Sequence, residues 1–154
     1  MCEVAPGEDA QVGVVETNRD FDIGWVRRAP VYKETLNKGR LWHISTLAAS
    51  AHMKSREPPN LENGILNLGN LRIPIHKKYL YLGAVAAPKQ LAYSPETNLE
   101  GITDKIVVIG VTHGIDVHST PFGPMYGPEV VGLFIETLLQ QSAPRPLAAE
   151  LSAL

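Results

Sequence analysis

The 154-residue chain contains a single cysteine, Cys2, next to its N-terminus. One cysteine rules out an internal disulfide framework and a zinc site built from cysteines. The sequence also lacks an uninterrupted apolar run of about 18 residues, which a membrane-spanning helix requires. Its first ten residues have neither the basic start nor the apolar stretch of a signal peptide.

The sequence also lacks an excess of either positive or negative charge. The chain has 14 Lys and Arg against 16 Asp and Glu, a net charge of -2. Its only basic clusters are the pairs Arg27-Arg28 and Lys77-Lys78, which are too short to follow a phosphate backbone. The glycine motifs that cradle nucleotide phosphates and the Gly-x-Ser-x-Gly motif of serine hydrolases are both absent. We therefore expect no nucleic-acid partner, no cofactor and no nucleophilic catalysis.

What is present is an ordinary globular composition, with 44% hydrophobic and 19% charged residues. At this length one domain with a substantial core is expected. In the N-terminal part, β-branched runs predict strands over residues 12–17 and 25–34, with Pro30 at an edge or an end. A 3.6-residue period predicts a helix over residues 39–54, whose apolar face would be formed by Leu41, Ile44, Ala48 and Ala51. Residues 71–75 and 79–85 flank a short polar turn and predict a β-hairpin, with Pro74 at a sheet edge.

The C-terminal part carries the strongest patterns. The continuous Ile/Val run over residues 105–111 is typical of a strand buried on both faces. A helix is predicted over residues 127–141, because Pro128 suits its first turn, Glu129 suits its positive end and apolar residues recur on one face. That face would be formed by Val131, Phe134, Ile135, Leu138 and Leu139. The predicted fold is α/β: a mixed sheet with helices packed on it and a C-terminal strand-loop-helix unit.

The loop between this strand and this helix holds His113, Asp116 and His118. Loops that leave the carboxyl ends of strands collect ligands in open α/β sheets, and the His-x-x-Asp-x-His spacing offers three metal ligands. One hypothesis is therefore a small metal-dependent hydrolase that uses these three residues. The alternative is structural, because Asp116 and Thr120 are residue types that bond to nearby backbone amides and shape turns.

The sequence "DKIVVIGVTHGIDVHSTPFGPMYGPEVVGLFIETLL" resembles the C-terminal signature of the CHASE domain of the second type. In that family a "GKIVLIG"-like strand leads to a loop with an Asp and a Thr-Pro, and a "PGVE"-like segment opens a helix. Upstream, "DFDIGWVRRAPV" is similar to the family's "DxDGVVRRVPL" segment. The chain departs from the pattern at Ile23, Asp104 and Pro128, and it lacks the family's N-terminal half. The resemblance thus indicates the C-terminal half of such a domain.

This resemblance implies a non-catalytic, extracytoplasmic sensory domain of a receptor whose output domain is a nucleotide cyclase, a histidine kinase or a serine/threonine kinase. Residues 1–11 would be a loose lead-in, residues 12–143 the sensory part, and residues 144–154 a tail toward a membrane segment. The partners implied are an unknown small-molecule ligand, the membrane and a second copy in a homodimer. Residues expected to bind the ligand or shape the loop are Arg27, Arg28, Asp116, Thr120 and Glu129. A third hypothesis is a purely structural module that dimerises through exposed sheet edges.

Overall fold

The computed structural model describes residues 18–19, 24–36, 39–55, 57–92, 94, 96–98, 100–112, 114 and 116–144. The two helices in this part of the chain are α1 (Ile44–His52) and α2 (Gly127–Leu139). The strands are β1 (Asn18–Arg19), β2 (Val26–Pro30), β3 (Tyr32–Thr35), β4 (Gly39–Trp42), β5 (Asn60–Glu62), β6 (Ile65–Leu68), β7 (Leu71–Pro74), β8 (Tyr79–Tyr81), β9 (Val117–Thr120) and β10 (Gly123–Tyr126).

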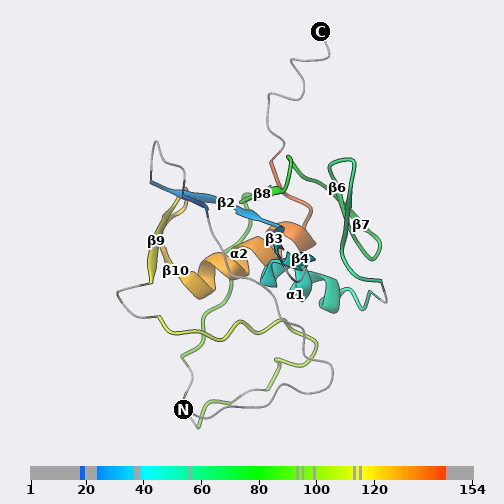
Figure 1. Ribbon diagram of the computed structural model, residues 1–154. Helices are drawn as coiled ribbons and strands as arrows, with labels where there is room; N and C mark the ends of the chain where they lie inside the picture. The colour runs from blue at the N-terminus through cyan, green and yellow to red at the C-terminus, as the bar shows by residue number, and fades with distance from the viewer. Residues whose placement is uncertain are drawn as a thin grey trace.

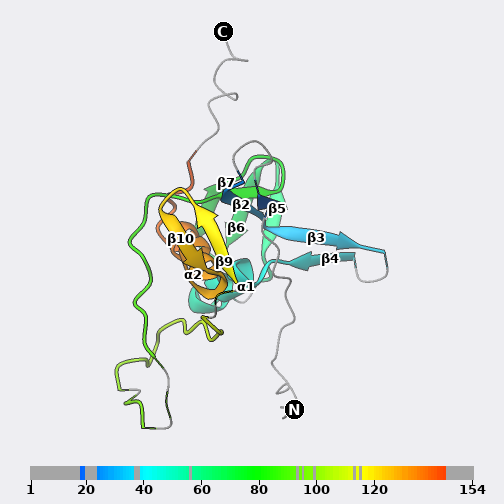
Figure 2. The same ribbon diagram turned by 90° about the vertical axis from the view of Figure 1, so that its left-hand side faces the viewer.

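The described strands form four small antiparallel sheets. Two have three strands, in the orders β1-β2-β8 and β5-β6-β7, and two are the pairs β3-β4 and β9-β10. Figure 1 shows α2 at the centre, with the β9-β10 pair on one side and α1 on the other. In Figure 2 the β3-β4 hairpin projects away from the rest of the molecule. The α/β class predicted from the sequence is confirmed, and the chain passes through the β9-β10 hairpin directly into α2.

Helix α2 supplies the largest share of the core. It packs against α1 and also contacts β9 and β10. Four of the five predicted apolar positions are buried, Leu139 is half-buried, and Val130, Leu133 and Thr137 are buried as well. The strands add further apolar side chains to the core, among them Val26, Leu66, Leu68, Ile73 and Leu80, and Val31 between β2 and β3 is buried with them. The predicted C-terminal helix is thus confirmed, but its buried surface is wider than the predicted apolar face, and the helix ends at Leu139.

The prediction for residues 39–54 was wrong in its first part and in its buried face. Residues 39–42 form β4, which pairs with β3, and the helix begins only at Ile44. The buried residues of α1 are Ser45, Thr46, Ala49 and Ser50, whereas Ala51 is exposed. Small side chains occupy this face because it contacts α2, and small residues let two helices approach closely. Apolar periodicity therefore selected the wrong side of the helix.

The predicted hairpin of residues 71–75 and 79–85 was also wrong. Strand β7 pairs with β6, and β8 pairs with β2. The isolated bridge between His76 and Tyr79 joins β8 only to the short segment that precedes it. The edge position of Pro74 is confirmed, since β7 is the outer strand of its sheet. Strand β6 instead forms hairpins with both of its neighbours in the chain, β5 and β7, and the β5-β6 hairpin turns at Asn63 and Gly64 with φ of 50° and 75°. A two-residue turn with two positive φ angles favours the dipeptide Asn-Gly.

The predicted buried strand over residues 105–111 was wrong as well. None of these residues is assigned to a strand, and most of them are exposed: Ile109 is 90% accessible and Val111 75%. Residues 83–116 make a long run without helix or strand among their described members, and part of this run loops away from the core in Figures 1 and 2. A strand needs hydrogen-bonding neighbours on its edges, and residues 106–111 have none within the part of the chain that the structure describes.

Two predictions for the N-terminal part had different outcomes. The predicted strand of residues 12–17 lies outside the described residues. The predicted strand of residues 25–34 is present as β2 and β3, with Pro30 at the end of β2 and a break at Val31. Of the helices in the described residues, none has both the length and the apolar character to cross a membrane.

Candidate functional site

Thr120 fixes the turn between β9 and β10. Its hydroxyl donates to the backbone oxygen of Gly123 at 2.7 Å and accepts from the backbone N–H of Phe122 at 3.1 Å. The side chain is buried, and both hydrogen-bonding roles of its hydroxyl are used within the turn. This geometry favours the loop-shaping role considered from the sequence.

Asp116 connects the loop to the start of α2. Its backbone oxygen accepts from the Gly127 N–H at 3.0 Å, and a Cβ on Gly127 would overlap the Asp116 carboxylate. The carboxylate oxygen Oδ1 lies 3.0 Å from Nε2 of His118. The Asp116 side chain is half-exposed, whereas that of His118 is mostly buried. A glycine at position 127 is therefore needed for the loop to lie against the helix.

Glu129 caps the N-terminus of α2. Its Oε2 accepts from the backbone N–H of Tyr126 at 2.7 Å, and its Oε1 accepts from the side-chain amide of Gln90. The first bond satisfies one of the amides that a helix start leaves without an intrahelical partner. The second connects α2 to the irregular segment that follows β8. Glu129 thus holds two segments together.

Arg27 and Arg28 lie on β2, which packs beside β9. As expected for neighbours in a strand, they differ: Arg27 is exposed and Arg28 is partly buried. The Arg28 guanidinium carbon lies 4.8 Å from the ring centre of Tyr79, and Nη1 donates to the Tyr81 hydroxyl at 3.2 Å. This places the Arg28 side chain along β8, so a ligand role stays a prediction for both arginines.

The hypothetical metal site remains incomplete in this structure. His113 lies outside the described residues, and only Asp116 and His118 are placed together. Within the described ranges, no three His, Cys, Asp or Glu side chains gather in a way that could hold a metal ion.

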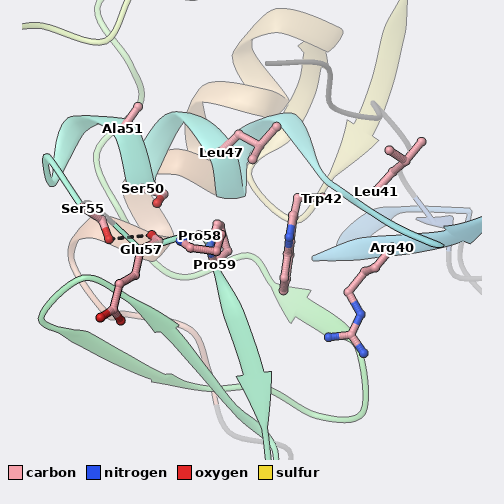
Figure 3. Close-up of a pocket in the computed structure, with 10 residues that line it drawn as sticks. All are labelled: Arg40, Leu41, Trp42, Leu47, Ser50, Ala51, Ser55, Glu57, Pro58 and Pro59. Carbon is pink, nitrogen blue, oxygen red and sulfur yellow. Dashed lines mark hydrogen bonds between the residues drawn. The ribbon is translucent and has the colours of Figure 1, made fainter. Parts of the chain in front are cut away.

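A cleft that the sequence did not reveal lies elsewhere, between β4, α1, Ser55 and residues 57–59. Its volume is about 460 Å³, within the range of small-molecule sites. In Figure 3 the Trp42 ring stands in the middle, with Pro58, Pro59 and Leu47 on one side and Arg40 on the other. Glu57 lies at the far end from Arg40, beyond the two prolines.

The cleft joins an apolar middle to opposite charges. The Arg40 guanidinium carbon lies 4.1 Å from the ring centre of Tyr32 and 5.7 Å from that of Trp42, which holds the cation in place. Ser55 fixes the turn at the other end, because its hydroxyl donates to the backbone oxygen of Glu57 at 2.8 Å. Trp42 and the Pro58-Pro59 pair were the only sequence signals, and their proximity depends on the tertiary fold.

The model of the CHASE2 domain matches residues 3–153, which is nearly the whole chain. This is a family of extracellular sensory domains. The chain therefore belongs to the CHASE2 domain family, as the sequence resemblance indicated, and a sensory role follows from that membership. Neither the curated proteins nor the solved structures contain a match to this chain.

Proposed function

We propose that the chain is the extracytoplasmic sensory part of a transmembrane receptor whose output domain is a nucleotide cyclase, a histidine kinase or a serine/threonine kinase. The observation that carries this proposal is the family match over residues 3–153. In the parent receptor, membrane helices would connect the chain to the output domain.

The proposal also holds that the chain has no catalytic activity of its own. The packing of the loop supports this, because Thr120 and Glu129 use their polar atoms to hold the turn and the helix start. The Asp116 carboxylate faces His118 and Gly127. These residues are engaged in shaping the loop.

Signalling would work by a population shift. A ligand that binds one conformer more tightly favours that conformer, and the difference in affinity sets the size of the shift. Helix α2 is the natural element to report it, because it contacts α1, β9 and β10 and leads to the C-terminal end of the described chain. The output domain would respond to the position of this helix.

Two observations test this proposal together: the open reading frame in which this sequence lies, and the enzymatic activity of the output domain of the parent protein. We expect membrane helices and a cyclase or kinase domain in the same frame, and an output rate that changes when Gln140, the exposed C-cap residue that follows α2, is substituted. A parent frame that encodes only this chain, or a purified chain that hydrolyses substrates in a metal-dependent way, would contradict the proposal.

A further inference from the structure

The cleft beside β4 has an open backbone edge. Strand β4 pairs with β3 on one side, and in the described part of the chain nothing pairs with its other side. The His43 N–H donates to the backbone oxygen of Val31 at 2.8 Å. In an antiparallel ladder hydrogen-bonded pairs alternate with non-bonded ones, so the backbone N–H and C=O groups of Arg40 and Trp42 point away from β3.

This open edge borders the cleft. Three consecutive β4 residues, Arg40, Leu41 and Trp42, line it. Neighbouring side chains of a strand point to opposite faces, so a surface that touches three in a row must run along the edge of the strand. An extended polypeptide can add to such an edge through main-chain hydrogen bonds, while pockets select its side chains.

The charges at the two ends fit the ends of a short peptide. Within the described residues Arg40 and Glu57 have no ion-pair partner, and they lie at opposite ends of the cleft in Figure 3. Arg40 matches a terminal carboxylate, and Glu57 matches a terminal ammonium group. Between them, Trp42, Leu47 and Pro59 form an apolar wall. A tripeptide in extended form spans about 10 Å, the same length as the three consecutive β4 residues that line the cleft.

We propose that this cleft binds a short apolar peptide with free ends, in extended form, as an added strand on β4. Its carboxylate lies at Arg40, its ammonium group at Glu57, and its central side chain packs against the Trp42 ring. As a statement about signalling, the inference rests on the sensory role proposed above, because it names the class of ligand that the sensor would detect. Binding itself is a property of the isolated chain.

Isothermal titration calorimetry on the 154-residue chain, with trileucine as the probe, tests the proposal. We expect binding with a Kd of about 1 mM or tighter, and a roughly 10-fold or larger loss in Arg40→Gln and in Glu57→Gln, because a hydrogen bond to a charged group is removed. Arg72→Gln and Glu96→Gln are matched controls, since both side chains are exposed and lie outside the cleft. They should bind like the wild type.

Two further ligands and one further variant complete the test. Acetylated and amidated trileucine should bind at least 10-fold more weakly than the free peptide, and free leucine should not bind measurably. Trp42→Ala should abolish binding, and Trp42→Phe should restore part of it if the ring stacks on the ligand. Absence of trileucine binding, equal binding of the blocked peptide or of leucine, or equal losses in the control variants would each overturn the proposal. None of these results bears on the output of the parent receptor, so failure here and failure of the sensory role are distinguishable.

Discussion

Residues 106–111 give the sharpest test of the fold, because their composition and their position in the structure disagree. Ile109 is 90% accessible, whereas Ile73 on β7 is fully buried. An Ile→Ala change removes three carbons in both cases. At Ile73 this costs roughly 2.4 kcal/mol of transfer free energy at about 0.8 kcal/mol per carbon, before the cavity is counted. Measured core truncations of this kind cost about 2–5 kcal/mol.

We therefore expect Ile73→Ala to lower the melting temperature by at least roughly 5–10 °C, since the transfer free energy alone is about 2.4 kcal/mol and about 1 kcal/mol corresponds to 2–4 °C at this chain length. Ile109→Ala should change the free energy of unfolding by less than about 0.5 kcal/mol, as exposed substitutions do. Thermal and urea melts followed by circular dichroism measure both variants against the wild type.

The variant Ile109→Lys extends the comparison. A lysine at an exposed position should be tolerated, whereas the same charge in a strand covered on both faces would be strongly destabilising. If Ile109→Ala costs as much as Ile73→Ala, or if Ile109→Lys prevents folding, then residues 105–111 form the buried strand that their sequence suggests, and the arrangement described for residues 83–116 is incorrect.

Three further predictions concern the surroundings of α2. Thr137→Val should lower the free energy of unfolding by about 1–3 kcal/mol, because the buried Thr137 hydroxyl accepts from the Gly83 N–H at 3.1 Å and that amide would lose its partner. Thr137→Ser keeps the hydroxyl and should lose less stability. Equal losses in the two variants would refute the role of this hydrogen bond. Gly132→Ala should lower the free energy of unfolding, measured in a urea melt, by up to about 2 kcal/mol. A Cβ there would lie 2.6 Å from Cγ of Pro88, and the cost of this overpacking exceeds the gain in helix propensity. A raised melting temperature would contradict this close approach. Asp116→Ala should act mainly on folding or loop order, visible as a lower melting temperature, and an unchanged melting temperature with a lost receptor response would make Asp116 a binding residue.

Much of the local structure could be predicted where one pattern dominates. Pro128 and Glu129 marked the start of α2, and its apolar residues marked a buried helix, because capping and periodicity agree there. The Asn63-Gly64 turn was not predicted, although this dipeptide is the strongest short-range signal of a hairpin.

Other features depend on contacts between distant segments and could not be predicted from local patterns. The buried face of α1 carries Ser45, Thr46 and Ser50 because α2 lies against it, and no periodic pattern in the helix itself indicates that neighbour. The pairing of β8 with β2 joins residues about fifty positions apart. The cleft depends on residues 57–59 returning to Trp42, so neither its shape nor its opposite charges can be predicted from local motifs.

The position of the chain relative to the membrane tests the central claim most directly. Alkaline phosphatase folds into an active enzyme only outside the cytoplasm, so its fusion to the parent receptor after residue 144 reports on which side this domain lies. We predict an active fusion at this point and an inactive one within the output domain. An inactive fusion after residue 144, together with an active cytoplasmic reporter at the same position, would contradict an extracytoplasmic sensory role.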